Sequence, residues 1–255
     1  RILSIVSMVL ALLSRETAVL FPALLMIFYI SFLSKEKLIP ALKKSFIISI
    51  PFLVISIIYF ILRLTVFNFQ NTLNFFSQPT PYSENLSFRL FTFGSALIEY
   101  FKILFVPTGL HMERSLLVNT SFFQWPVWFG ALIVAIVILV GFAFYRNSKV
   151  ENSLKIENLK LKIKEPNSFK IWFFAWFWFF AALAPVSGII PINAIIYEHW
   201  LYLPIIGFVA LAGFYIDNFL DFLKVHKHAI SYWLLVISLV IYFSFFVVQS
   251  IRRNI

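Results

Sequence analysis

The chain has 255 residues, of which 61% are hydrophobic, 20% aromatic and only 13% charged. Soluble domains are roughly 45–50% apolar, so this composition excludes an ordinary soluble protein. The net charge of +10 does not indicate a nucleic-acid partner, because basic residues between apolar segments of a membrane protein first report its orientation. The absence of cysteine excludes disulfides and thiolate chemistry.

Long apolar segments separated by short charged clusters predict an all-α, polytopic bundle of transmembrane helices. We expect a single transmembrane domain over 1–255 with about seven crossings. The first apolar segment, 2–13, is too short for a span of roughly 20 residues, so we expect the domain to be truncated at its N-terminus. The other six expected spans are 17–33, 46–62, 125–145, 171–187, 201–216 and 231–249.

The charged segments between the spans predict the orientation of the bundle. Segment 34–45 carries four lysines, and the loop 146–170 carries seven basic residues. The positive-inside rule predicts that both are cytoplasmic, together with the turn 217–230, and that the C-terminus is outside. An even number of crossings must then separate the two basic segments, and the spans 46–62 and 125–145 supply it.

The long region 63–124 is therefore expected on the outer side, and the apolar piece 95–107 within it is not expected to cross. Glu99 and Lys102 lie in the middle of this short piece, where charges in hydrocarbon would be costly. We interpret 95–107 as a re-entrant or interfacial helix at the outer surface.

Three polar clusters fall on this outer face, which points to one external site. The first contains Arg15 and Glu16, at the junction of two apolar segments. A solvated hairpin tip explains the pair equally well. The alternative is that Arg15 faces a lipid phosphate, since a guanidinium binds phosphate oxygens in a bidentate manner.

The second cluster follows the predicted interfacial helix and consists of His111, Glu113 and Arg114. Three ionisable groups within four residues suit a polar headgroup held at the membrane surface, although an ordinary exposed loop has the same composition. No second histidine stands at ligand spacing from His111, so no metal site is predicted here.

The third cluster contains the strongest candidate pair, Glu198 and His199. Glu198 could act as a base, accept a hydrogen bond from a sugar hydroxyl, or brace Arg15 or Arg114. An interfacial belt, with aromatic rings at headgroup level and the charged groups in water, is the alternative. The segment 190–207 holds the polar and aromatic residues Asn193, Tyr197, Glu198, His199, Trp200 and Tyr202.

These clusters carry a family resemblance. LLSRETAVLFPALLMIFY at 12–29, EYFKILFVPTGLHMERSL at 99–116 and APVSGIIPINAIIYEHWLYLPIIGF at 184–208 resemble three conserved segments of the transmembrane and tetratricopeptide-repeat O-mannosyltransferases and their bacterial relatives. The three segments occur in the family's order and together span most of the chain. The third contains the family's Leu-Tyr-Leu-Pro sequence, which here begins at Leu201.

The resemblance implies a GT-C membrane glycosyltransferase that moves a mannose-like hexose from a polyprenyl-phosphate donor to a protein or glycan acceptor. It implies an integral protein of the bacterial cytoplasmic membrane with its site facing outside, and a divalent metal is compatible with it. The family's catalytic base is expected upstream of Arg1, and tetratricopeptide repeats downstream of this chain. The implied substrate-binding residues are Arg15, Glu16, His111, Glu113, Arg114, Tyr197, Glu198, His199 and Tyr202.

Two departures bear on substrate choice. The family's Arg after the conserved Glu is His199 here, and its Asp-Trp pair is Glu113–Arg114. The donor or acceptor is therefore expected to differ from the family's own.

A transporter or lipid-linked sugar flippase is the competing function, and a passive membrane scaffold is a third. Polar groups at one face, without inverted repeats, favour the enzyme over the transporter.

Overall fold

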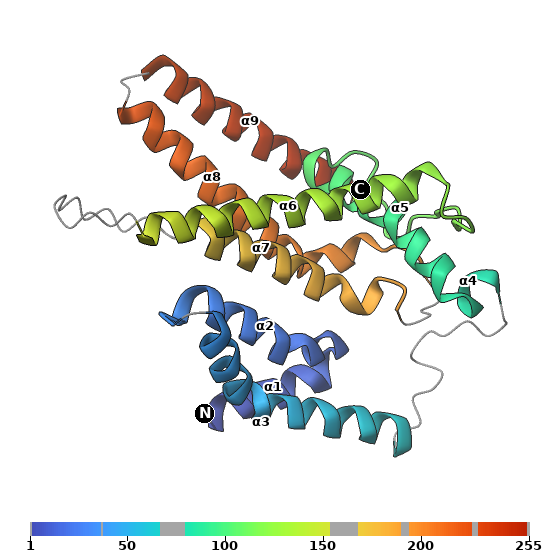
Figure 1. Ribbon diagram of the computed structural model, residues 1–255. Helices are drawn as coiled ribbons and strands as arrows, with labels where there is room; N and C mark the ends of the chain where they lie inside the picture. The colour runs from blue at the N-terminus through green and yellow to red at the C-terminus, as the bar shows by residue number, and fades with distance from the viewer. Residues whose placement is uncertain are drawn as a thin grey trace.

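The computed structural model describes residues 2–36, 38–66, 80–153, 168–189, 194–225 and 229–253. Within these ranges the chain is helical and contains no β-strand, which confirms the predicted all-α bundle. Figure 1 shows the long helices lying side by side, with the N-terminal helices grouped along one side of the bundle.

The N-terminal group is made of two antiparallel rods preceded by a short helix. Glu16–Leu33 forms one continuous rod from a 3-10 turn, an α-helix and a π-turn, and α3 runs back alongside it (Figure 1). The elements are α1 (Ile2–Ser14), η1 (Glu16–Leu20), α2 (Phe21–Phe28), η2 (Tyr29–Leu33) and α3 (Leu38–Thr65).

The rest of the chain forms the larger part of the bundle. Figure 1 shows α6 and α7 side by side at its centre, with α8 and α9 extending as a helical hairpin. The elements are α4 (Pro81–Glu84), α5 (Leu86–Phe105), α6 (Trp125–Ser153), α7 (Ser168–Leu183), η4 (Ala184–Val186), η5 (Glu198–Tyr202), α8 (Ile205–Val225) and α9 (Ala229–Arg253).

Six helical segments are long and apolar enough to cross a membrane, so the protein is an integral membrane protein by length and composition. They correspond to six of the seven expected crossings, and the remaining one, α1, is a helix of only 13 residues. The six are Glu16–Leu33, Leu38–Arg63, Trp125–Arg146, Ser168–Val186, Ile205–Leu223 and Ser231–Arg252.

Several helices are longer than the sequence predicted. α8 continues through most of the expected turn 217–230, because Phe219, Leu220 and Phe222 extend its apolar spacing. α6 likewise continues to Ser153 inside the expected loop 146–170, since no Gly or Pro interrupts it there. Residues 154–167 of that loop lie outside the described residues.

The predicted interfacial helix also begins earlier than expected. α5 starts at Leu86 rather than at 95 and is 20 residues long, because 86–94 is itself apolar with helical spacing. It ends before Pro107, where the residue preceding a proline disfavours the helical conformation. α5 is not among the six membrane-spanning candidates, and its depth in the bilayer stays a prediction.

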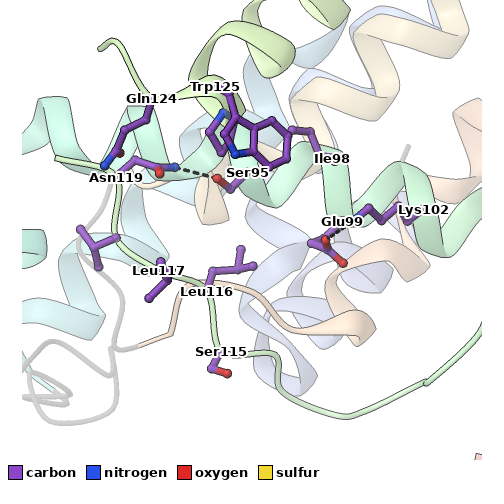
Figure 2. A pocket seen from close by; sticks show the side chains of 12 residues that line it. Ser95, Ile98, Glu99, Lys102, Ser115, Leu116, Leu117, Asn119, Gln124 and Trp125 are labelled. Atoms are coloured by element: carbon purple, nitrogen blue, oxygen red, sulfur yellow. Dashed lines mark hydrogen bonds and ion pairs between the residues drawn. The ribbon is translucent and has the colours of Figure 1, made fainter. Parts of the chain in front are cut away.

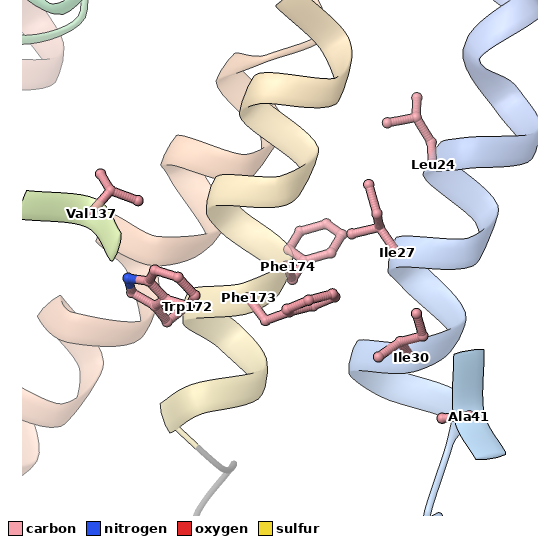
Figure 3. Packing of buried hydrophobic residues seen from close by; sticks show 8 residues of the cluster. All are labelled: Leu24, Ile27, Ile30, Ala41, Val137, Trp172, Phe173 and Phe174. Carbon is pink, nitrogen blue, oxygen red and sulfur yellow. The ribbon is translucent and has the colours of Figure 1, made fainter. Parts of the chain in front are cut away.

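Aromatic and aliphatic side chains hold the N-terminal rod against α7. Leu24 and Ile27 face Phe173 and Phe174, and Figure 3 shows these side chains filling the space between the two helices. The ring centroids of Phe32 and Phe174 lie 4.9 Å apart at a steep angle, the geometry that aromatic pairs prefer.

Two contacts define the ends of the bundle. At one end, the Nζ of Lys170 donates a hydrogen bond to the carbonyl of Ser34, so the start of α7 meets the segment 34–45. At the other end of the same rod, Glu16 forms an ion pair with Arg63, near the end of α3. The first is called the lysine end and the second the Arg63 end.

Candidate functional site

The centre of the candidate site is the carboxylate of Glu198, which opens the short helix η5. Its side chain is only 4% exposed. One carboxylate oxygen accepts hydrogen bonds from Arg114 Nε at 2.9 Å, from Arg114 Nη2 at 2.7 Å and from the backbone N–H of His111 at 2.8 Å. A buried charge of this kind is stable only when it is paired and hydrogen-bonded, as it is here.

Backbone pairing brings these two distant segments together. The Glu198 N–H donates to the Met112 carbonyl, the Arg114 N–H donates to the Ile196 carbonyl, and Glu113 and Tyr197 form an isolated antiparallel bridge. This pairing fixes the register in which Arg114 meets Glu198.

A glycine turn completes the Arg114 site. Gly109 adopts a φ of 57°, which glycine tolerates best, and its carbonyl accepts a hydrogen bond of 2.7 Å from Arg114 Nη2. The loop that follows α5 thus holds the guanidinium from one side while Glu198 holds it from the other.

A second carboxylate extends this ion-pair network. Glu99 on α5 lies 3.6 Å from Arg114 Nη1 and also pairs with Lys102 one turn further along the helix. The four groups, Glu99, Lys102, Arg114 and Glu198, carry two positive and two negative charges and so balance one another. In the sequence, Glu99 and Lys102 indicated only that the helix should not cross; the structure adds Glu99 to the site.

Arg15 reaches the same short helix η5 from the N-terminal group. Its guanidinium carbon lies 4.8 Å from the centroid of the Tyr202 ring, within the range of a cation–π contact. The Tyr202 hydroxyl makes a hydrogen bond of 3.0 Å with the hydroxyl of Thr17. Arg15 is exposed and makes no ion pair with the described part of the chain, so its guanidinium is open to an anion.

Glu16 points away from this site. Its carboxylate binds Arg63 on α3, whose guanidinium also donates to the Tyr59 hydroxyl at 3.0 Å. The adjacent residues Arg15 and Glu16 therefore serve different contacts, one toward η5 and the other within the N-terminal group. Arg63 was not a candidate from the sequence, because nothing in its apolar surroundings marks a partner 47 residues away.

The aromatic residues beside Glu198 form a small stack at the surface. The rings of Tyr197 and His199 lie 5.1 Å apart and nearly parallel, and Trp200 meets Tyr197 edge-on at 5.0 Å. Desolvation, together with the nearby Glu113 carboxylate, raises the pKa of the Tyr197 phenol above its ordinary value. Glu198 and His199 thus diverge, the first into the interior and the second into this stack.

Two of the remaining predicted residues are exposed and one is not described. The side chains of His111 and Glu113 are exposed, and Asn193 lies outside the described residues. In the part of the chain that the structure describes, no three His, Asp or Glu side chains gather closely enough to hold a metal ion.

A cavity of about 690 Å³ adjoins the network on the Glu99 side. It lies between α5, the loop after it and the start of α6, and the sequence assigned none of its lining residues to a binding site. No local sequence pattern marks the other lining residues as neighbours of Glu99. They include Leu116, Leu117 and Asn119 on the loop and Trp125 at the start of α6.

No protein-family model, curated protein or solved structure matches this chain. The functional inference therefore rests on the contacts above and on the three sequence segments that carry the resemblance. Those segments supply the residues that meet at η5: Arg15 and Thr17 from the first, Arg114 from the second, and Glu198 and Tyr202 from the third.

Proposed function

We propose that the chain is the membrane domain of a glycosyltransferase that takes a mannose-like hexose from a polyprenyl-phosphate donor and passes it to a protein or glycan acceptor. The observation that carries the proposal is that Arg15 and Arg114 both contact η5, the first through Tyr202 and the second through Glu198, beside a bundle of apolar helices. A lipid-linked phosphate carries its charge at headgroup depth, so its protein partners belong at helix ends.

The two arginines have different roles in this proposal. Arg114 is engaged by Glu198, by the Gly109 carbonyl and by Glu99, which makes it a positioning residue that holds η5 to the loop after α5. Arg15 rests on an aromatic face and has no carboxylate partner among the described residues, so it is our candidate for the donor phosphate. The sequence left three possible roles for Glu198. The observed contacts agree with one of them, in which Glu198 braces an arginine.

The chemistry is an inverting displacement at the anomeric carbon. The acceptor hydroxyl oxygen forms a bond to that carbon, the bond from the carbon to the phosphate oxygen breaks, and the lipid phosphate leaves with the electron pair. The hydroxyl proton passes to a general base, which the family resemblance implies to be an acidic residue. Arg15 stabilises the charge that develops on the departing phosphate.

Sidedness is part of the proposal. The site lies at the Arg63 end of the bundle, away from the lysine end, which the positive-inside rule assigns to the cytoplasm. We therefore propose that the site opens to the non-cytoplasmic face of a bacterial inner membrane.

Donor binding and transfer test the proposal directly. The complete protein, purified in detergent, is titrated with a polyprenyl phosphate mannose carrying a radiolabelled sugar, and transfer to acceptor is measured in parallel. We expect the affinity for the donor to fall about tenfold to a hundredfold in Arg15→Ala, which corresponds to the loss of one charge-assisted contact. Lys44→Ala is the matched control, because Lys44 forms an exposed ion pair with Glu36 at the lysine end.

Two results would reject the function. One is equal donor binding by the wild type, Arg15→Ala and Lys44→Ala. The other is movement of the intact donor across proteoliposome membranes without any transfer, which would identify a flippase instead.

A further inference from the structure

The cavity beside α5 combines apolar walls with polar side chains. Figure 2 shows the Trp125 ring and Ser95 on one side, Leu116 and Leu117 across from them, and Glu99 with Lys102 toward one end. Its volume of about 690 Å³ falls within the range of roughly 300–1,000 Å³ that is typical of small-molecule sites.

The Trp125 indole is available to a ligand. The residue is 66% exposed although it belongs to the start of a long helix, and its one described ring contact is edge-on with Phe129 at 5.9 Å. The Trp125 ring and the two leucines line an apolar slot between them. A slot of this kind suits a ring-shaped ligand with apolar C–H faces.

Hydrogen-bonding groups stand around the edge of the slot. The Asn119 amide donates to the Ser95 hydroxyl at 2.6 Å and to the Phe91 carbonyl, which fixes its orientation. The Gln124 side-chain oxygen is buried and accepts no hydrogen bond from the described part of the chain. The Glu99 carboxylate lines the same cavity and is held by Lys102 and Arg114.

We propose that this cavity binds a neutral pyranose ring, with Trp125 against one face of the sugar and Gln124, Asn119 and Glu99 bonded to its hydroxyls. A hydroxyl of the sugar donates to the Gln124 oxygen, which otherwise lacks a donor, once the side chain turns this buried oxygen toward the cavity. An anionic ligand is disfavoured, because Lys102, the one lysine among the described lining residues, is already neutralised by its ion pair with Glu99. A polyprenyl chain is disfavoured as well, since it would bury the partly exposed Glu99 carboxylate against hydrocarbon.

The position of the cavity suggests what the sugar does. Glu99 belongs both to the cavity and to the ion-pair network that ends at Glu198. The bound sugar is therefore assigned as the acceptor, and this assignment, unlike the binding itself, rests on the proposed function. The acceptor is then a glycan rather than a bare protein hydroxyl.

Equilibrium dialysis of the complete protein against radiolabelled methyl α-mannoside, methyl α-glucoside and methyl α-galactoside tests the site. At least one of the three is expected to bind, and Trp125→Ala and Gln124→Met are each expected to weaken that binding by about tenfold or more. Trp233→Ala is the matched control, because Trp233 is similarly exposed at 62% but lies on α9, outside the cavity. Gel filtration of each variant checks that it is folded.

Three outcomes would overturn the proposal. They are the absence of binding by all three glycosides, unchanged binding by both cavity variants, and displacement of the bound glycoside by a polyprenyl alcohol that carries no sugar. Because the glycosides lack phosphate, a protein that fails to bind the lipid donor can still pass this test, and a protein that binds the donor can fail it.

Discussion

Glu198 shows at the scale of a single residue how a membrane protein keeps a buried charge. Three donors converge on one of its oxygens, and two of them come from Arg114, which is 84 residues away in the sequence. Removing one partner of such a pair leaves the other buried and uncompensated, so both residues are expected to matter for folding as well as for function.

We therefore expect Glu198→Gln to lower the free energy of unfolding by about 1.5–3 kcal/mol, the value of hydrogen bonds to charged groups. Thermal or denaturant unfolding in detergent measures the change. Glu36→Gln is the control, since Glu36 belongs to an exposed ion pair with Lys44, and such pairs contribute about 0–1 kcal/mol. Equal losses in the two variants would show that the Glu198 pair has no special weight.

A second prediction for a single residue concerns the contribution of Arg89 to stability. Its buried guanidinium donates to the carbonyls of Gly188 and Ser83, each at 2.6 Å, and so joins α5 to α4 and to the segment after η4. Arg89→Met should destabilise the fold by about 1.5–3 kcal/mol for each charge-assisted bond that is lost. Unfolding of Arg146→Met, whose side chain is exposed, is the comparison; no difference between the two would contradict the structural role of Arg89.

At the scale of elements, glycines set how closely helices approach. A Cβ at Gly130 of α6 would lie 2.5 Å from the Cα of Gly94 on α5, and one at Gly207 of α8 would lie 2.3 Å from the carbonyl oxygen of Ala175 on α7. Small residues at these crossings let the backbones touch, which is a common way for helices to associate in membranes.

The crossing of α5 and α6 gives a prediction with a built-in control. Gly130→Ala should destabilise the protein, because one of the two helices must move to admit the methyl group. Gly213→Ala should instead stabilise it by about 0.5–1 kcal/mol, since an added Cβ there meets nothing within 4 Å and alanine is the better helix former. Thermal unfolding measures the stability of both variants relative to the wild type. A Gly130→Ala variant that is more stable than the wild type would contradict the close crossing of α5 and α6.

At the scale of the whole molecule, the two ends of the bundle hold different charged contacts. The lysine end holds the segment 34–45, and the opposite end holds the contacts of Arg15, Arg63 and Glu198. The positive-inside rule orients the first toward the cytoplasm.

Labelling of single cysteines tests this orientation on a chain that has no cysteine of its own. With an impermeant maleimide on intact cells, Leu117→Cys should react from outside, because Leu117 is 90% exposed in the loop after α5. Lys44→Cys should react only after permeabilisation. The reverse pattern would invert the topology and place the candidate site in the cytoplasm.

The sequence by itself determined the class of the protein and six of its membrane-spanning helices. These follow from local composition, because an apolar segment of sufficient length must become a helix in a bilayer that offers its backbone no other hydrogen-bond partners. The ends of α5, α6 and α8 were predicted less well. A change from apolar to polar residues marks where a helix leaves the membrane, and the helix itself can continue beyond that point.

Only the tertiary structure decided which charges meet. From the sequence, Arg15 and Glu16 formed one cluster and Glu198 and His199 another. In the structure each pair separates, because neighbouring side chains along the backbone point in different directions. The partners Arg63 and Arg114 are 47 and 84 residues from the carboxylates that they bind, and no local pattern encodes such a distance. The cavity beside Glu99 depends in the same way on how α5, its loop and α6 pack together, which is a property of the assembled bundle.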